Sequence, residues 1–425
     1  MFTRTLLAIL LSLVASTAAA QTLRYFSWNP ELAEIEAPLI AAFEEEHGVT
    51  VEVEALPPDQ YWPRMRALAA AGRLPDVFYM SSGFIAEWQS EGLLADLTPF
   101  VADLDLSDYY SGVLSVAEFP QGGNVYAFPV NWVGTVLYYN ADAFDAAGVA
   151  YPNDDWTWDD FLTAADALTI DENGDGTIDQ WGYWAYGRYA HIEPWIFNNG
   201  GDLLNEARTR LDVNDGAREA LTFLTDLVHE HGVAPTPASL EGIRQQDVFP
   251  QGIAAMWVDG TWNIANNRTI VDGAFAWDIA QVPNGPSSTG DVGYTWPDMM
   301  AMSPNGDQQD LAFDFIRHMT GEERSTDLYL GGTVPFLRTT AQSDAWLELD
   351  QQPANKDVIL DIGSLPGKTS FTPNWGEWRG YAAAEEGGMN GELDAAFNGS
   401  KTIDEAIERF TEYGNGVLER VYPNP

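Results

Sequence analysis

Residues 23–53 read LRYFSWNPELAEIEAPLIAAFEEEHGVTVEV, and this stretch decides the fold class. Residues 23–28 alternate in polarity as a strand does, apolar residues recur at helical spacing from Leu32 to Phe43, and Gly48 offers that helix a C-cap. Residues 49–53 then alternate again. A strand, helix, strand unit of about 30 residues requires a right-handed crossover and a parallel strand pair. The sequence therefore predicts an α/β fold, in which ligands bind at the strand ends.

The same pattern continues along the chain and predicts two lobes. A helix over 61–71 leads to a buried strand at 77–80, and the extended run 126–140 is expected to make a first crossing between lobes. Thr157 and Thr402 are predicted helix N-caps, with Asp160 and Glu405 as their partners. Breaks at 283–293 and 331–335 predict a second and a third crossing. Two lobes are expected because one core rarely organises about 400 residues. From the predicted crossings, we expect lobe 1 to hold 21–130 plus about 292–333, and lobe 2 to hold 131–291 plus about 334–425.

The first twenty residues have the composition of an export signal. Arg4 supplies a positive charge, residues 6–14 form an apolar run, and residues 18–20 are three alanines that suit cleavage. The sequence predicts a cleaved signal peptide over 1–20 and a periplasmic mature chain that begins near Gln21. The chain contains no cysteine, which excludes both a lipid anchor at the cleavage site and disulfide bonds.

The charge balance excludes two classes of partner. With 64 acidic and 20 basic residues, the formal net charge is −44. Nucleic acid and anionic membrane surfaces would both be repelled by such a chain.

Several segments, in order, resemble those of one known family. They are residues 42–51 (AFEEEHGVTV), 72–77 (GRLPDV), 91–97 (EGLLADL), 126–140, 156–161 (WTWDDF), 199–202 (NGGD) and 252–262 (GIAAMWVDGTW). Together they make the mature chain similar to the family 1 extracellular solute-binding proteins of ABC importers, the group that includes maltose-binding protein. The resemblance implies a type II periplasmic binding fold, in which two α/β lobes joined by a three-segment hinge close over a ligand. It also implies a monomer that delivers a sugar to permease subunits in the inner membrane and needs no cofactor.

A sugar site needs flat aromatic faces and short polar side chains, and the chain holds sixteen Trp and seventeen Tyr. By resemblance, Trp262 in the Gly-Thr-Trp segment is the first choice for stacking on the ligand. The other predicted ligand contacts are Trp28, Asn29, Tyr61, Ser81, Ser82, Asn131, Trp132, Trp296, Trp375 and Trp378. Tyr61 and Trp62 open a helix that could face the cleft, and both have an equally good interpretation as packing residues. Arg379 could pair with a ligand carboxylate or with one of the many protein acids.

Residues 171–179 (DENGDGTID) have the spacing of a calcium loop. Their oxygen ligands would be Asp171, Asn173, Asp175, Thr177 and Asp179, with Gly176 at the turn. Gly182 stands where such a loop has its bidentate glutamate. The alternative is a plain Asn-Gly/Asp-Gly turn, and any bound calcium would be structural.

Two alternatives to a sugar-binding protein stay open at this point. The same aromatics would suit a polyol or a cationic osmolyte, the latter through cation-π contacts. A secreted glycoside hydrolase would use two carboxylates, but among 64 acids some such pair is inevitable and so carries no information. The chain has no Gly-x-Ser-x-Gly elbow and no thiol, so we expect no catalytic residues.

Overall fold

The computed structural model describes residues 21–425 apart from 29, 111–112, 115–117, 120–122, 187, 323, 325–333, 349–350, 366, 381–386 and 423–425. The predicted signal peptide over 1–20 and the predicted contact Asn29 lie outside the described residues. Among the helices that are described, none has both the length and the apolar character that a membrane crossing demands.

Lobe 1 is built on a five-stranded sheet of order β2-β1-β3-β12-β6. Its strands are β1 Thr22–Ser27, β2 Thr50–Ala55, β3 Val77–Ser81, β6 Phe128–Pro129 and β12 Asp298–Met302. The predicted strand, helix, strand opening is confirmed, since β1 and β2 pair in parallel on either side of α1 Ala33–His47. Gly48 ends α1 with φ 65°, a conformation that glycine adopts without steric cost.

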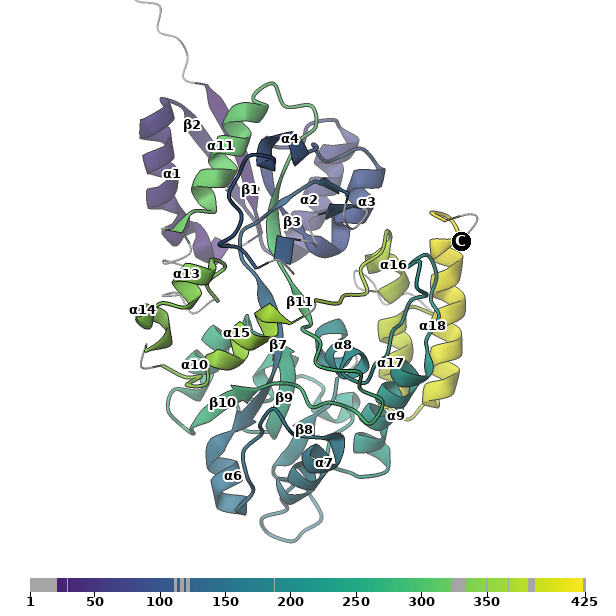
Figure 1. Cartoon of the computed structure of the whole chain (residues 1–425). Coiled ribbons are helices and arrows are strands. Elements are labelled where there is room, and N and C mark those ends of the chain that lie inside the picture. Colours follow the sequence, from purple (N-terminus) through teal and green to yellow (C-terminus); the bar gives the residue numbers. More distant parts are fainter. Residues whose placement is uncertain are drawn as a thin grey trace, which may run out of the picture.

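Helices cover both faces of this first sheet. α1 packs beside α11 Gln309–Met319 on one side, and α2 Pro58–Ala70 and α3 Ile85–Ser90 lie on the other (Figure 1). The remaining elements of lobe 1 are η1 Pro30–Leu32, η2 Ser82–Phe84, α4 Thr98–Val101, β4 Glu118–Phe119 and β5 Asn124–Val125. Parallel strands covered on two faces bury both sides, which is why every residue of β3 before Ser81 is buried.

Lobe 2 has its own sheet, of order β10-β7-β9-β8, with β11 also paired to β7. Its strands are β7 Val133–Asn140, β8 Trp181–Trp184, β9 Ala254–Gly260, β10 Trp277–Ala280 and β11 Thr295–Trp296. All eight residues of β7 are buried. The chain thus forms the predicted two-lobed α/β fold, in which each lobe has a five-stranded sheet and buried hydrophobic residues packed against it.

Two helices of lobe 2 begin at the N-caps that the sequence predicts. Both predicted capping boxes are present: Thr157 and Asp160 open α7 Trp158–Ala167, and Thr402 and Glu405 open α18 Ile403–Leu418. The other helices of this lobe are α6 Ala141–Ala147, α8 Tyr189–Phe197, α9 Asp215–His229, η3 Pro237–Leu240, η4 Gln245–Asp247, α10 Asn263–Val271, α13 Arg338–Ala341, α14 Asp344–Leu347, α15 Asp357–Ser364, α16 Trp375–Arg379 and α17 Met389–Phe397.

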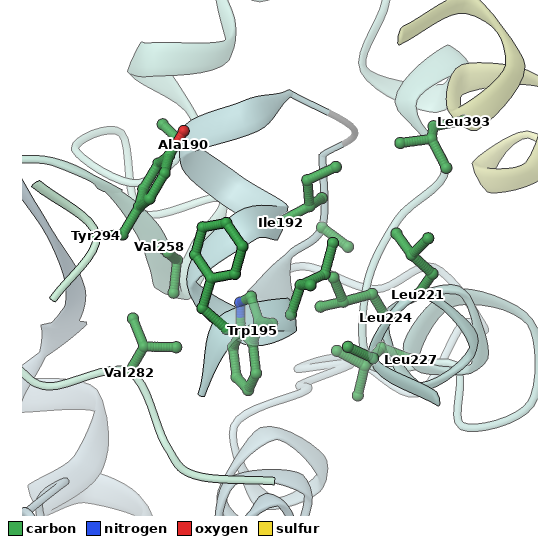
Figure 2. Packing of buried hydrophobic residues seen from close by; sticks show 14 of the residues in the cluster. Ala190, Ile192, Trp195, Leu221, Leu224, Leu227, Val258, Val282, Tyr294 and Leu393 are labelled. Carbon is green, nitrogen blue, oxygen red and sulfur yellow. The ribbon is translucent and has the colours of Figure 1, made fainter. Parts of the chain in front are cut away.

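The core of lobe 2 holds α8 against the sheet. Figure 2 shows Trp195 of α8 between Val258 of β9 and leucines of α9. Trp195 is fully buried, and its indole nitrogen donates to the Tyr183 hydroxyl at 3.2 Å. This packing fixes the start of α8, where Tyr189 lies.

The chain passes between the two sheets at residues 130–132, between β6 and β7, and again at residue 297, between β11 and β12. The second passage follows Trp296, whereas the predicted boundary lies near residue 292. The reason is that β11 still pairs with lobe 2, with Trp296 opposite Val133. The third predicted crossing, at 331–335, falls mostly outside the described residues.

Candidate functional site

A cavity lies between the two lobes and is lined by residues of both. It holds about 590 Å³ of space not occupied by atoms, part of it open to solvent. Its lining residues are Trp28, Trp62, Ser81, Phe84, Tyr189, Trp296, Asp298, Phe371 and Trp375. In lobe 1, Trp28 follows β1, Ser81 ends β3 and Phe84 follows it, so these residues lie at the carboxyl ends of the strands, where α/β proteins bind ligands.

Aromatic rings form most of the wall. In lobe 1 the Trp62 ring lies 5.5 Å from that of Trp28 and 4.5 Å from that of Phe84, measured between centroids. On the lobe 2 side the Tyr189 ring lies 5.4 Å from Trp296 and 5.3 Å from Trp375. The two groups give the cavity aromatic faces from both lobes.

The lobes touch each other at one edge of this cavity. The rings of Phe84 in η2 and Trp375 in α16 meet edge to face at 6.4 Å. Glycines permit this approach, since a Cβ on Gly83 would lie 3.3 Å from Trp375 and a Cβ on Gly376 would lie 3.2 Å from Phe84. The helix α16 therefore bridges lobe 2 to lobe 1 (Figure 1).

Polar groups gather at the floor of the cavity, where the chain passes between lobes. Asp298 pairs across the sheet with Ser81. The Asn131 amide donates to Asp298 Oδ2 at 3.0 Å, and the Asp298 backbone N–H donates to Asn131 Oδ1 at 3.0 Å. Burial raises the pKa of the Asp298 carboxyl from 3.8 to about 6, against the opposing effects of Asn131 and the Arg324 guanidinium.

Behind this floor, a buried ionic network ties the first passage to lobe 1. The Arg324 guanidinium donates to the Val130 carbonyl at 2.8 Å and to Glu36 at 2.8 Å, and it also contacts the Tyr79 hydroxyl. Tyr25 donates to the other oxygen of Glu36 at 3.0 Å. Every donor needed by this buried carboxylate therefore comes from the protein itself.

A second buried ion pair supports the aromatic wall of lobe 2. Arg379 and Glu193 are both fully buried and in contact, and the Ser370 hydroxyl bonds to each of them. The guanidinium carbon lies 5.3 Å from the Trp375 ring and 5.9 Å from the Tyr189 ring. Of the two roles left open for Arg379, the structure shows the pairing with a protein acid.

Four predicted contacts line the cavity: Trp28, Ser81, Trp296 and Trp375. Trp262 is not among the lining residues. It is 40% exposed, and its ring lies 5.4 Å from that of Trp296. Asn131 does not line the cavity either, but it is hydrogen-bonded to Asp298, which does.

Four other predicted contacts lie away from the cavity, in the protein interior. Tyr61 donates its hydroxyl to the Tyr79 carbonyl at 2.6 Å, Trp132 its indole N–H to the Pro335 carbonyl at 2.9 Å, and Trp378 its indole N–H to Thr372 at 2.8 Å. Ser82 is buried in η2. The single polar atom of each of the three aromatic residues thus has its partner in the interior.

Sequence reasoning missed four lining residues, Phe84, Tyr189, Phe371 and Asp298, and it left Trp62 open between the cleft and the core. Trp62 follows Tyr61, and consecutive helical residues point about 100° apart, so only one of the two faces the cavity. The signal for Asp298 was an acid directly after Trp296-Pro297, at the start of an otherwise apolar strand.

The proposed calcium loop forms turns closed by its own side chains. Asp171 accepts backbone N–H groups from Gly174 at 2.7 Å and from Gly176 at 2.8 Å, and these bonds lower the pKa of its carboxyl. Asp179 accepts from the backbone of Glu172 at 2.8 Å. Within the part of the chain that the structure describes, no three His, Asp or Glu side chains are grouped to hold a metal. Calcium binding stays a prediction.

Two α/β lobes around an aromatic cavity define a protein that holds a small molecule between its halves. The chain matches the family model of the bacterial extracellular solute-binding proteins over residues 28–324, and it belongs to that family. Members of this family bind solutes and are not enzymes, which excludes the glycoside hydrolase alternative.

Individual relatives agree with this assignment. The chain is 24% identical to the galactooligosaccharide-binding protein of Bacillus subtilis, over 72% of this chain and 70% of that protein. Its fold is similar to that of an ABC substrate-binding protein of Listeria monocytogenes solved with cycloalternan, at a TM-score of 0.78, 23% identity and coverage of 95% and 100%. It is also similar to the sugar-binding protein MalE of Xanthomonas citri, at a TM-score of 0.79, 18% identity and coverage of 95% and 100%.

Proposed function

We propose that this chain captures a neutral mono- or oligosaccharide in the periplasm and delivers it to the permease of an ABC importer in the inner membrane. It acts as a monomer, and it alters no bond of its ligand. One observation carries the proposal: seven aromatic rings contributed by both lobes line a single cavity, together with the polar residues Ser81 and Asp298.

The chemistry of a sugar fits this lining. A pyranose ring presents C–H groups on its faces and hydroxyls around its rim, so it needs flat apolar surfaces and a few polar groups that fix its orientation. Trp28 and Trp62 offer such surfaces from lobe 1, and Trp296 and Trp375 offer them from the other side. The names of the relatives from Bacillus subtilis and Xanthomonas citri, which refer to sugars, support the same class of ligand.

Capture requires the lobes to close on the ligand. The contact between Phe84 and Trp375 joins them without a ligand, and a solute that touches both aromatic groups would add to this contact only in the closed arrangement. Small-angle scattering with and without a saturating saccharide tests this step. We expect the radius of gyration to fall on binding, and an unchanged value contradicts closure.

Ligand identity is tested by thermal-shift screening against saccharides, polyols and betaines. We expect saccharides to raise the melting temperature, and Trp296→Ala to weaken binding of the best saccharide by about 2 kcal/mol, roughly 30-fold. Tyr151→Ala is the matched control, because Tyr151 is an exposed aromatic residue that does not line the cavity. A shift with betaines alone, or equal affinity in both variants, contradicts the saccharide proposal.

A cationic osmolyte is the second candidate, and one observation favours it. Aromatic faces around a carboxylate are the surroundings that bind ammonium groups, and Asp298 supplies that carboxylate here. The same screen separates the two candidates.

A further inference from the structure

The cavity has a single sign of charge. Of its nine lining residues, Asp298 is the only one that is ionisable near neutral pH, and none is Lys or Arg. Two guanidinium groups lie behind the lining, but both are fully buried and each is paired with an acid, Arg324 with Glu36 and Arg379 with Glu193. No described lining residue can therefore offset a negative charge brought in by a ligand.

The Asp298 carboxylate is also held in one place. Its Oδ2 accepts from the Asn131 amide at 3.0 Å, and the same Asn131 accepts from the Asp298 backbone at 3.0 Å. This reciprocal pair fixes the carboxylate next to Ser81, its partner across the sheet. A fixed carboxylate accepts hydrogen bonds from hydroxyl or ammonium groups, and it repels carboxylates and phosphates.

We propose that Asp298 determines the charge specificity of the cavity, admitting neutral and positively charged ligands and rejecting anionic ones, with Asn131 as its positioning residue. For sugars, this inference rests on the proposed function and narrows it to neutral and amino sugars, against uronates and sugar phosphates. Near pH 7 the carboxyl is mainly ionised, since burial raises its pKa only to about 6.

The first test uses three small probes of nearly the same shape: choline, 3,3-dimethylbutan-1-ol and 3,3-dimethylbutanoate. Each is titrated into the full chain near pH 7 at constant ionic strength, and tryptophan fluorescence reports binding. In the wild type we expect choline to bind more tightly than the alcohol, and the alcohol to bind at least about tenfold more tightly than the acid. In Asp298→Asn the three probes should bind with nearly equal affinity, and in Asn131→Ala the differences in affinity should be smaller than in the wild type.

Glu46→Gln is the matched control, because it removes one charge from an exposed acid of α1 that does not line the cavity. Urea unfolding of each variant establishes that it is folded. The proposal is overturned if the acid binds the wild type as tightly as the alcohol, if Asp298→Asn keeps the wild-type order, or if none of the three probes binds.

A second series, D-glucosamine, D-glucose and D-glucuronate, separates this inference from the proposed function. If sugars bind and glucuronate binds as well as glucose, only the role of Asp298 fails. If no saccharide binds while the three probes keep their order, the saccharide proposal fails and the role of Asp298 stands.

Discussion

Replacing Arg379 tests the buried ion pair that supports the aromatic wall of lobe 2. Arg379→Met leaves the Glu193 carboxylate without its cation, at a position where both side chains are 0% exposed. Breaking a buried pair in this way costs about 3–5 kcal/mol. Because the Ser370 hydroxyl still donates to Glu193 at 2.6 Å, we expect the lower end, about 3 kcal/mol.

The assay is urea unfolding followed by tryptophan fluorescence, with Arg218→Met as the matched control. Arg218 pairs with Asp404 at the surface, where the side chains are 45% and 74% exposed, so its loss should cost less than about 1 kcal/mol. Adding Glu193→Gln to Arg379→Met should recover part of the loss, because no buried charge then lacks a partner. A cost for Arg379→Met within about 1 kcal/mol of the control would refute the reasoning.

Three further measurements test other parts of the structure. Burial raises the pKa of Asp298 from 3.8 to about 6, so its ionisation opposes folding increasingly from about pH 4 and to the full extent above about pH 6. In thermal unfolding, Asp298→Asn should therefore be more stable by up to about 3 kcal/mol at pH 7, and this advantage should disappear as the pH falls to about 4; an advantage that does not change with pH contradicts the shift. Gly83→Ala brings a Cβ to 3.3 Å from Trp375 and should weaken saccharide binding by about 1 kcal/mol, measured by titration calorimetry; unchanged affinity counts against the interlobe contact. Calcium added to chelated protein should release or absorb heat and raise the melting temperature, and Asp171→Ala should remove both effects; no heat and no thermal shift in the wild type would eliminate the site.

Periodicity and capping predicted the elements, because both are local signals. The strand, helix, strand unit of residues 23–53 and the capping boxes at Thr157 and Thr402 depend on residues a few positions apart, and the structure contains all three. The position of the second passage was less accurate, since β11 belongs to lobe 2 through pairing with β7, and β7 lies more than 150 residues earlier in the chain.

Choosing cavity residues by type was less successful, because aromatic side chains suit both a core and a sugar site. Trp375 lines the cavity, whereas Trp378, three residues later on the same short helix, is fully buried with its N–H bonded to Thr372. In the same way, Trp62 lines the cavity, whereas its neighbour Tyr61 is buried with its hydroxyl bonded to the Tyr79 carbonyl. Only the tertiary structure shows which rings have their polar atoms satisfied by the protein and which border an open space.

The polar floor of the cavity is also the place where the lobes are connected, and this has a mechanical consequence. Asn131 lies in the first passage, Asp298 follows the second, and two hydrogen bonds join them. The carbonyl of Val130, next to Asn131, is held by Arg324, which is anchored to Glu36 in lobe 1. A ligand that bonds to Asp298 is therefore linked to the first passage through the Asp298–Asn131 hydrogen bonds, and it lies next to the second. If the lobes rotate about these segments as we propose, the binding energy of the ligand acts on them directly, and the proposed ligand selection and lobe closure depend on the same few side chains.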